Sequence, residues 1–272
     1  MPRVAIVTGA AGGIGRAIAA RLAAEGWDLA LADRDAGGLE AVAASPGIAG
    51  RTVTCHVVDL LDRDAPERLL AEVAAAHGAL HLLVNNAGIT VLGPLEAQSR
   101  EDVERVLMTN LVAVAQLCRV ATPLLVASAP SHIVNIASFA GILAFPMQTT
   151  YSAAKFGVRG LSAALRIELS DRRVGVSAVL PGSVATTLMK GATTYDSGLS
   201  TRFTESMLRY GASPDSVARA VSLCVSRGRP EMLVGWDAHL GVRAHRWMPG
   251  LVRRGFDAAW ARYRRSLPDR VG

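Results

Sequence analysis

The sequence is poor in cysteine, aromatic residues and lysine, and these shortages exclude several kinds of protein. Of its 272 residues, three are cysteines and 5% are aromatic. Cys55, Cys118 and Cys224 lie far apart in apolar segments, in an odd number and without the spacing of a metal site. We therefore expect reduced, buried thiols, no metal site and a cytoplasmic protein.

Long apolar runs are absent as well. No uncharged apolar run approaches the roughly 20 residues that are needed to cross a bilayer. At the N-terminus, Met1-Pro2-Arg3 leads directly into a strand-like run, which leaves no space for a signal peptide. Both observations agree with the cytoplasmic location that the cysteines predict.

The net charge of +6 belongs to the end of the chain. Residues 242–272 contain eight arginines and two aspartates, so residues 1–241 are neutral overall. A neutral body has no electrostatic reason to bind a polyanion, and we predict no nucleic-acid partner.

The body alternates short apolar runs with longer segments of helical periodicity. Apolar runs without polar alternation are typical of parallel strands that are covered on both faces. The pattern predicts an α/β fold with a doubly wound parallel sheet, the Rossmann fold, in a single domain over residues 1–241. The predicted strands are Val4–Thr8, Leu29–Ala32, Val53–Val58, Leu80–Val84, His132–Ala137 and Val174–Leu180, and the predicted helices lie near 13–25, 63–77, 100–127 and 151–170, with another that begins at Ser213-Pro214-Asp215.

The turn after the first strand is rich in glycine and reads Thr8-Gly9-Ala10-Ala11-Gly12-Gly13-Ile14-Gly15. Glycines here permit a tight turn and let the backbone approach a pyrophosphate at the N-terminus of the next helix. The alternative is a loop in which the glycines serve only close packing. The position of the glycine turn between a predicted strand and a predicted helix favours the dinucleotide site.

The second predicted strand is followed by Asp33, eighteen residues after Gly15. A carboxylate there can accept hydrogen bonds from the adenosine ribose and would repel a 2′-phosphate, although a plain surface turn is the alternative. Arg34 complicates the prediction, because an arginine beside the ribose can bind that phosphate. We predict NAD as the cofactor, with NADP left open by Arg34.

The strongest chemical signal is the pair Tyr151 and Lys155. Four residues apart on one helix, they share a face, and a nearby ammonium favours the phenolate and lowers the tyrosine pKa. Such a tyrosine can exchange a proton with a carbinol or carbonyl oxygen. The chain has only one other lysine, Lys190, beside 27 arginines. A surface pair is the alternative, but Ser138, thirteen residues earlier at a strand end, can stabilise an oxyanion.

Together these motifs resemble the short-chain dehydrogenase/reductase superfamily, over residues 4 to about 235. The resemblance rests on the glycine turn, on Asn86-Ala87-Gly88, on Ser138 with Tyr151 and Lys155, and on the run Pro181-Gly182-x-Val184-x-Thr186. It implies a catalytic set of Asn110, Ser138, Tyr151 and Lys155, in which Asn110 holds a water of the proton relay. It also implies a homodimer or homotetramer packed through helices near 100–127 and 151–170. From the residues and the resemblance together, the predicted cofactor-binding residues are Gly9, Gly13, Ile14, Gly15, Asp33, Arg34, Asp59, Leu60, Asn86, Ala87, Gly88, Tyr151, Lys155, Pro181, Gly182, Val184 and Thr186.

We therefore predict an NAD(P)-dependent oxidoreductase that interconverts a secondary alcohol and a ketone. Apolar residues after Ser138 favour a hydrophobic substrate, and loop 187–212 has the composition of a lid. The pocket residues expected on this ground are Ala140, Ile142, Leu143, Phe145 and Met147. A catalytically silent dinucleotide-binding or scaffold protein is the alternative from another class. An epimerase or dehydratase of the same fold would need a second acid/base residue, which the sequence does not indicate.

Residues 242–272 form an Arg-rich, aromatic extension that predicts an amphipathic helix. Val252, Phe256, Trp260 and Tyr263 share one stripe at helical spacing, and most arginines lie off it. One interpretation is a peripheral membrane contact with anionic lipid. The other is a helix that docks on the body or on a neighbouring subunit. The sequence leaves both open.

Overall fold

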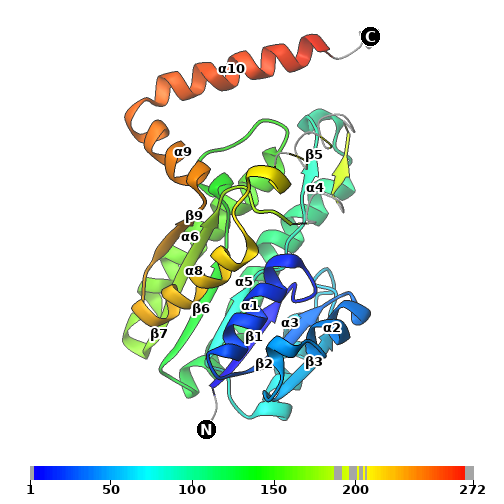
Figure 1. The fold of residues 1–272 in the computed structure, drawn as a ribbon, viewed down its shortest axis with the longest axis vertical. Helices are drawn as coiled ribbons and strands as arrows, with labels where there is room; N and C mark the ends of the chain where they lie inside the picture. Colours follow the sequence, from blue (N-terminus) through cyan, green and yellow to red (C-terminus); the bar gives the residue numbers. More distant parts are fainter. Residues whose placement is uncertain (1–2, 187–191, 196–200, 202–204, 206, 267–272) are drawn as a thin grey trace.

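The computed structural model describes residues 3–186, 192–195, 201, 205 and 207–266. Seven strands form one sheet in the order β3-β2-β1-β4-β6-β7-β9, and every neighbouring pair is parallel (Figure 1). The doubly wound sheet predicted from the sequence is confirmed. Its strands are β1 (Arg3–Thr8), β2 (Trp27–Asp33), β3 (Val53–Val57), β4 (Leu82–Asn85), β6 (Ser131–Ile136), β7 (Val174–Pro181) and β9 (Glu231–Val234).

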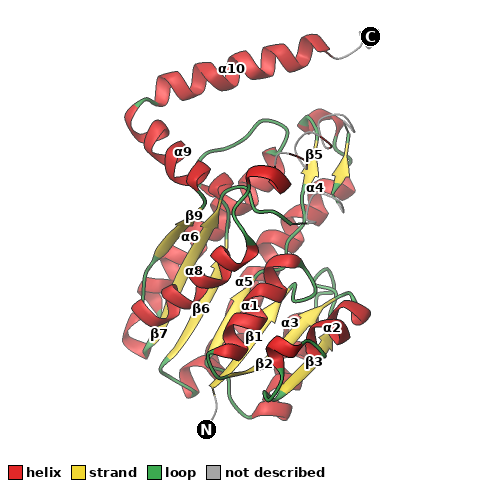
Figure 2. Cartoon of the chain, in the orientation of Figure 1, coloured by secondary structure: helices red, strands yellow, loops and turns green. Residues whose placement is uncertain are grey.

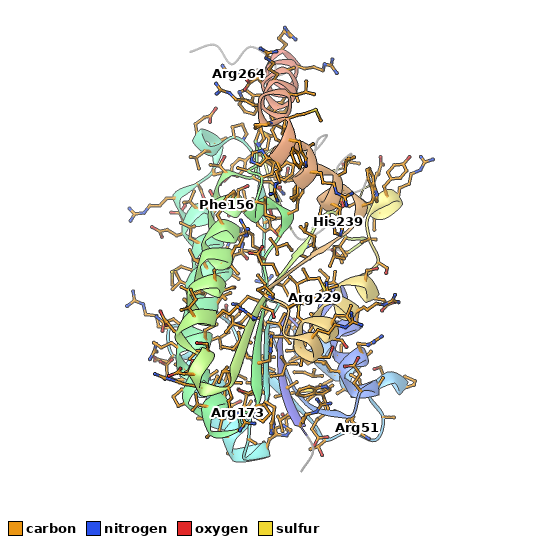
Figure 3. All side chains as sticks on the ribbon, turned by 90° about the vertical axis from the view of Figure 1, so that its left-hand side faces the viewer. Arg51, Phe156, Arg173, Arg229, His239 and Arg264 are labelled. Atoms are coloured by element: carbon orange, nitrogen blue, oxygen red, sulfur yellow. The ribbon has the colours of Figure 1, made fainter. Side chains whose placement is uncertain are left out.

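Helices cover both faces of the sheet, as the continuous apolar strands require (Figures 2 and 3). Along β1, Ala5 and Val7 belong to the apolar core on one face and Ile6 to the core on the other, all fully buried. The first face is covered by α1 (Gly13–Ala24), α2 (Ala36–Ala43) and α8 (Pro214–Arg227), and the second by α3 (Ala65–His77), α5 (Ala113–Ala127) and α6 (Thr149–Glu168).

Several elements were not predicted, because their sequence signals are weak. Helix α2 contains two glycines and depends on the side chain of Asp35, which accepts a hydrogen bond from the Gly38 amide at 3.0 Å. A second, two-stranded sheet pairs β5 (Val91–Leu92) with β8 (Thr193–Thr194). Short 3-10 turns are η1 (Pro46–Ile48), η2 (Leu95–Ala97), η4 (Phe139–Gly141) and η5 (Ser170–Arg172).

The helical stretch predicted near 100–127 is not one regular helix. It consists of α4 (Arg100–Leu107), the π-helical turn η3 (Met108–Val112) and α5. By length and composition alone, residues 100–127 could cross a membrane. In the fold, however, Leu117, Ala121 and Leu125 of α5 are buried in the core on the second face of the sheet.

Two helices follow β9 and lie at the end of the molecule opposite the N-terminus (Figure 1). They are α9 (Trp236–Trp247) and α10 (Pro249–Ser266). The predicted boundary between residues 241 and 242 falls inside α9, and the break in helical structure comes at Met248. The division into 1–241 and 242–272 stays a prediction. Much of the predicted lid 187–212, including 187–191 and 196–200, lies outside the described residues, so the lid stays a prediction too.

The glycine turn packs directly against the beginning of α1. A Cβ atom on Gly15 would overlap the carbonyl oxygen of Gly9 and lie 2.7 Å from the Cα atom of Ala10. Both are backbone atoms, so a neighbouring side chain cannot relieve the overlap by rotating. Gly160, within α6, is the opposite case, because a Cβ there would meet nothing within 4 Å.

We expect Gly15→Ala to destabilise the protein by about 1–3 kcal/mol, because the extra methyl forces the turn away from α1. Gly160→Ala should instead stabilise it by about 0.5–1 kcal/mol, as alanine does in a helix interior. Urea unfolding of both variants measures the difference. Equal stability of the two variants would contradict the close approach.

Candidate active site

The candidate site lies between β1 and β4, where the order in which the chain adds strands to the sheet reverses. The chain continues from β1 to β2 on one side and from β4 to β6 on the other, which leaves a crevice at the carboxyl ends of the strands. A cavity of about 650 Å³ lies at this edge. Its walls include every predicted cofactor residue: Gly9, Gly13, Ile14, Gly15, Asp33, Arg34, Asp59, Leu60, Asn86, Ala87, Gly88, Tyr151, Lys155, Pro181, Gly182, Val184 and Thr186.

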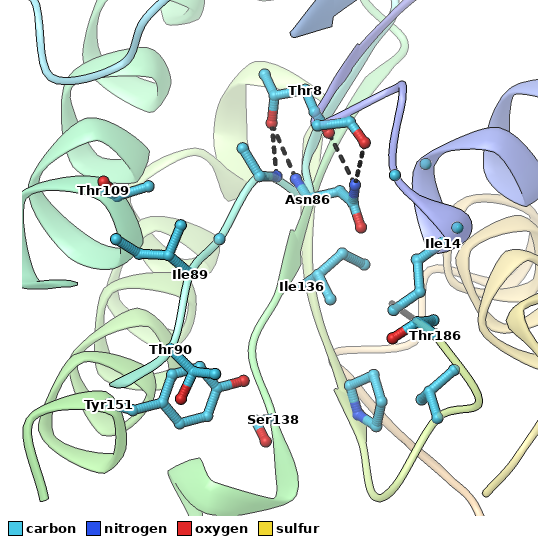
Figure 4. A pocket seen from close by; sticks show the side chains of 18 of the residues that line it. Thr8, Ile14, Asn86, Ile89, Thr90, Thr109, Ile136, Ser138, Tyr151 and Thr186 are labelled. Atoms are coloured by element: carbon cyan, nitrogen blue, oxygen red, sulfur yellow. Dashed lines mark hydrogen bonds between the residues drawn. The ribbon is translucent and has the colours of Figure 1, made fainter. Parts of the chain in front are cut away.

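The glycine turn and the end of β4 are held together by polar contacts (Figure 4). Asn86 Nδ2 donates to the carbonyl oxygens of Thr8 and Gly9, at 2.9 and 3.1 Å. The Thr8 hydroxyl accepts from the amides of Asn86 and Ala87, at 3.0 and 3.1 Å. The turn is therefore rigidly supported from the neighbouring strand.

Gly9 needs to be a glycine for two separate reasons. Its φ of +65° is a left-handed conformation that side chains disfavour. A Cβ at this position would also lie 2.8 Å from the Cα atom of Ala87. The turn leaves the N-terminus of α1 uncapped by any side chain, with Gly12 at the N-cap. Backbone amides at such an end can bind a phosphate, so the turn fits a dinucleotide pyrophosphate.

Asp33 ends β2 and contacts the glycine turn. Its Oδ2 accepts from the amide of Ala11 at 2.9 Å, and its Oδ1 accepts from the amide of Asp35 at 3.1 Å. The neighbouring Arg34 also lines the cavity. The Asp33 carboxylate, which is predicted to bind the ribose, therefore accepts a hydrogen bond from the glycine turn in this structure.

The segment after β7 forms another wall of the cavity and is braced by α9. Asp237, in the first turn of α9, accepts a hydrogen bond from the Ser183 amide at 2.7 Å. The absence of a side chain on Gly182 makes room for this carboxylate, because a Cβ there would overlap it. Val184 pairs with Ala212 in an isolated parallel bridge. The beginning of the predicted run from Pro181 to Thr186 is therefore held by Asp237, which is not among the residues predicted for the site.

Tyr151, Lys155 and Ser138 meet at one end of the cavity, on adjacent elements. Tyr151 and Lys155 lie in the first turns of α6, and Ser138 is the N-cap residue of η4. The Lys155 Nζ lies 5.6 Å from the centre of the Tyr151 ring and donates to the Ile136 carbonyl at 2.9 Å. Figure 4 shows the Tyr151 and Ser138 side chains side by side. The arrangement can hold an oxygen atom between two hydroxyls.

The pKa of Tyr151 differs from the expectation. Burial raises it, and the Ser138 side chain acts in the lowering direction. Burial also lowers the pKa of Lys155 to about 8. The lowered tyrosine pKa expected from the sequence is not found in the chain itself, because loss of hydration of the phenolate outweighs the lowering effect of the Ser138 side chain.

Asn110 lies in the π-helical turn η3, and its side chain binds the loop residue that follows Gly88. Its Oδ1 accepts from the Ile89 amide at 2.9 Å and its Nδ2 donates to the Ile89 carbonyl at 2.7 Å. The residue is fully buried and is not part of the cavity wall. The structure therefore brings Asn110 to the segment beside the site but not into contact with the cavity.

Other residues of the cavity were not predicted, because they come from distant elements. Thr90 is buried, and its hydroxyl has no hydrogen-bond partner in the described part of the chain. Arg105 of α4 is held by Asp102 and by the hydroxyl of Thr193 at 2.8 Å. Of the five predicted pocket residues, Ala140 and Phe145 line the cavity; Ile142 packs against the core instead, and Leu143 and Met147 lie off the wall. No local pattern distinguishes Thr90 or Arg105 in the sequence.

Comparison with known proteins decides the family. A family model described as short chain dehydrogenase matches residues 3–196. The chain belongs to this family. The SadH protein of Mycobacterium tuberculosis, an oxidoreductase by name, is 35% identical over 240 residues, which cover 87% of each chain.

Two solved structures of the short chain dehydrogenase family have the same fold. A protein from Burkholderia phymatum in complex with NAD has a TM-score of 0.84 at 30% identity and covers 92% of this chain and 95% of its own. A metagenomic protein in complex with NADP has a TM-score of 0.71 at 33% identity and covers 86% of this chain and 96% of its own. As a family member, this chain is an NAD(P)-dependent oxidoreductase that acts on CH–OH groups.

Proposed function

We propose that the chain interconverts a hydrophobic secondary alcohol and the corresponding ketone, with NAD as its preferred cofactor. The observation that supports this most directly is the shared cavity. It joins the Tyr151, Lys155 and Ser138 cluster to the glycine turn and to the segment from Pro181 to Thr186.

In this proposal each residue has a role set by its position. A nicotinamide held in the cavity would supply the hydride chemistry, as acceptor from the carbinol carbon in oxidation and as donor in reduction. Tyr151, as phenolate, takes the hydroxyl proton in oxidation and returns it in reduction. Ser138 donates a hydrogen bond to the substrate oxygen, and Lys155 favours the phenolate by its charge. Asn110 acts through Ile89, whose backbone it holds at both ends.

The cofactor would lie along the carboxyl edge of the sheet. The glycine turn, with Gly9, Gly13, Ile14 and Gly15, would hold the pyrophosphate, and Asp33 and Arg34 would bind the adenosine ribose. Asp59 and Leu60 would flank the adenine, and Asn86, Ala87 and Gly88 would lie under the chain of the cofactor. On the nicotinamide side, the holding residues would be Tyr151, Lys155, Pro181, Gly182, Val184 and Thr186.

The walls of the cavity favour an apolar substrate. Ile89, Phe139, Ala140, Phe145 and Met207 all contribute to it. The nearby Arg105 is already paired with Asp102, so it is not a free cation for an acidic substrate. The cytoplasmic location and the homodimer or homotetramer stay predictions.

We expect Tyr151→Phe to lower kcat by about 10²–10⁴-fold, the contribution of a general acid/base. Binding of NADH, measured by its fluorescence, should change little, because the aromatic ring is kept. Tyr210→Phe is the control, since this tyrosine is 58% exposed and not part of the cavity wall. Wild-type turnover in the Tyr151 variant would refute the mechanism.

The raised pKa of Tyr151 predicts opposite pH profiles for the two directions. Oxidation needs the phenolate, so its kcat/KM should rise as pH increases through the alkaline range. Reduction needs the phenol, so its kcat/KM should fall over the same range. Initial rates in both directions with one alcohol and ketone pair measure this, and parallel profiles would count against Tyr151 as the proton carrier.

Asp33→Asn tests the preference for NAD. Asparagine keeps an oxygen that can accept from the Ala11 amide but removes the charge that repels a 2′-phosphate. The ratio of kcat/KM with NAD to that with NADP should fall by about tenfold, the size expected for one charge at a partly exposed site. A wild-type preference for NADP that Arg34→Ala abolishes would show that the assignment is wrong.

A further inference from the structure

Helix α9 presents a row of large apolar side chains to solvent. Trp236, Leu240 and Trp247 are 65%, 58% and 76% exposed. Their spacing of four and seven residues places them on one side of the helix. Met248, between the two helices, and Leu251, in the first turn of α10, are 50% and 63% exposed. Several large apolar side chains exposed on neighbouring elements are typical of an interaction surface.

The same two helices carry many exposed arginines. Seven exposed arginines lie on the two helices, against a single exposed aspartate, Asp257. Among these seven, within the part of the chain that the structure describes, only Arg253 forms an ion pair, with Asp257 at 3.9 Å. Figure 3 shows Arg264 at the end of the molecule farthest from the N-terminal strand. The seven are Arg243, Arg246, Arg253, Arg254, Arg262, Arg264 and Arg265.

The opposite sides of both helices are fixed to the body. A Cβ on Gly241 would overlap the Phe139 ring, so α9 packs closely on that side chain. The Phe256 ring of α10 meets the Phe145 ring edge-on, with 5.6 Å between centroids. Val252, Phe256, Trp260 and Tyr263, the stripe predicted from the sequence, are the half-buried residues of α10. The side that faces outward is therefore set by packing.

We propose that this outward side, the α9–α10 face, binds the surface of an anionic membrane. The face consists of Trp236, Leu240, Trp247, Met248 and Leu251 with the seven arginines. Tryptophan is favoured at the boundary between acyl chains and headgroups, and arginine binds phosphate through paired hydrogen bonds. A surface that combines both matches an anionic bilayer.

Charge argues against a second copy as the partner. A symmetric contact through the α9–α10 face would place its arginines against the same arginines, and residues 1–241 are neutral overall. The phosphates of a nucleic acid could pair with the arginines, but a nucleic acid offers no apolar surface to cover the exposed leucine and methionine side chains. An anionic bilayer accommodates both kinds of side chain.

The proposed contact has a consequence for the substrate, which rests on the function proposed above. Phe139 and Phe145 line the cavity and also contact α9 and α10. A single layer of helix, α9 and α10, thus separates the cavity from the α9–α10 face, so the cavity would lie close to the bilayer. This placement suits an alcohol or ketone that is dissolved in the membrane.

Co-sedimentation of the full chain with vesicles tests the proposal, without cofactor or substrate, so its outcome is independent of the proposed reaction. We expect binding to vesicles of equal parts phosphatidylcholine and phosphatidylglycerol, and at least tenfold weaker binding to phosphatidylcholine alone. Replacing Arg262, Arg264 and Arg265 by glutamine should weaken binding by about tenfold to a hundredfold. Trp236→Ser with Trp247→Ser should also weaken it, and added salt should release the wild type.

Matched controls remove the same kinds of side chain elsewhere. Glutamine at Arg63, Arg172 and Arg227 removes three exposed charges, and Ile167→Ser removes an apolar side chain that is 77% exposed on α6. Neither control should change binding, and thermal melting verifies that all variants fold.

Three outcomes would overturn the proposal. The first is equal binding of the wild type to both kinds of vesicle, or binding to neither. The second is dissociation of an oligomer to monomers by the tryptophan substitutions in the absence of lipid, which would identify a subunit interface. The third is tighter binding to duplex DNA than to the anionic vesicles, with no loss on replacing the tryptophans.

Discussion

The close approach of the first turn to the end of β4 is the constraint on which the site depends. Gly9 lies so near Ala87 that no side chain fits between them, and Asn86 donates to two carbonyl groups across the gap. These contacts join the ends of β1 and β4, the two strands between which the strand order reverses. The crevice for the cofactor opens there because the chain leaves the two strands toward opposite sides.

The reactive end of the cavity depends on anchors that carry no chemistry themselves. Lys155 is held by the Ile136 carbonyl, and Asn110 holds both backbone groups of Ile89 from the π-helical turn. Such side chain to backbone contacts fix the geometry at little cost in hydration, because each buried polar group finds a partner.

The C-terminal helices α9 and α10 contact residues that line the cavity. Asp237 begins α9 and at the same time holds the Ser183 amide beside the cavity. Phe139 and Phe145 line the cavity and contact the two helices. A change in the position of α9 would therefore also move residues in the wall of the cavity. This coupling gives the extension a structural role that is independent of what its outer side binds.

The sequence alone determined the alternation of strands and helices and the family, and every cofactor-binding residue that it predicted lies in the wall of the cavity. Those features are local: apolar runs, a glycine turn, and a tyrosine and lysine one helical turn apart. The sequence also shows the stripe of Val252, Phe256, Trp260 and Tyr263 at helical spacing, but it does not show which side of that helix meets the body.

Only the tertiary structure decided the rest, because the deciding contacts join residues far apart in the chain. Asp237 reaches a backbone amide 54 residues earlier, and Arg105 pairs with Thr193, 88 residues later. The direction of the Tyr151 pKa depends on burial, which no spacing reveals. The exposed row on α9 is likewise invisible in the sequence, since tryptophan and leucine at helical spacing usually face a core, and only packing on the other side left them in solvent.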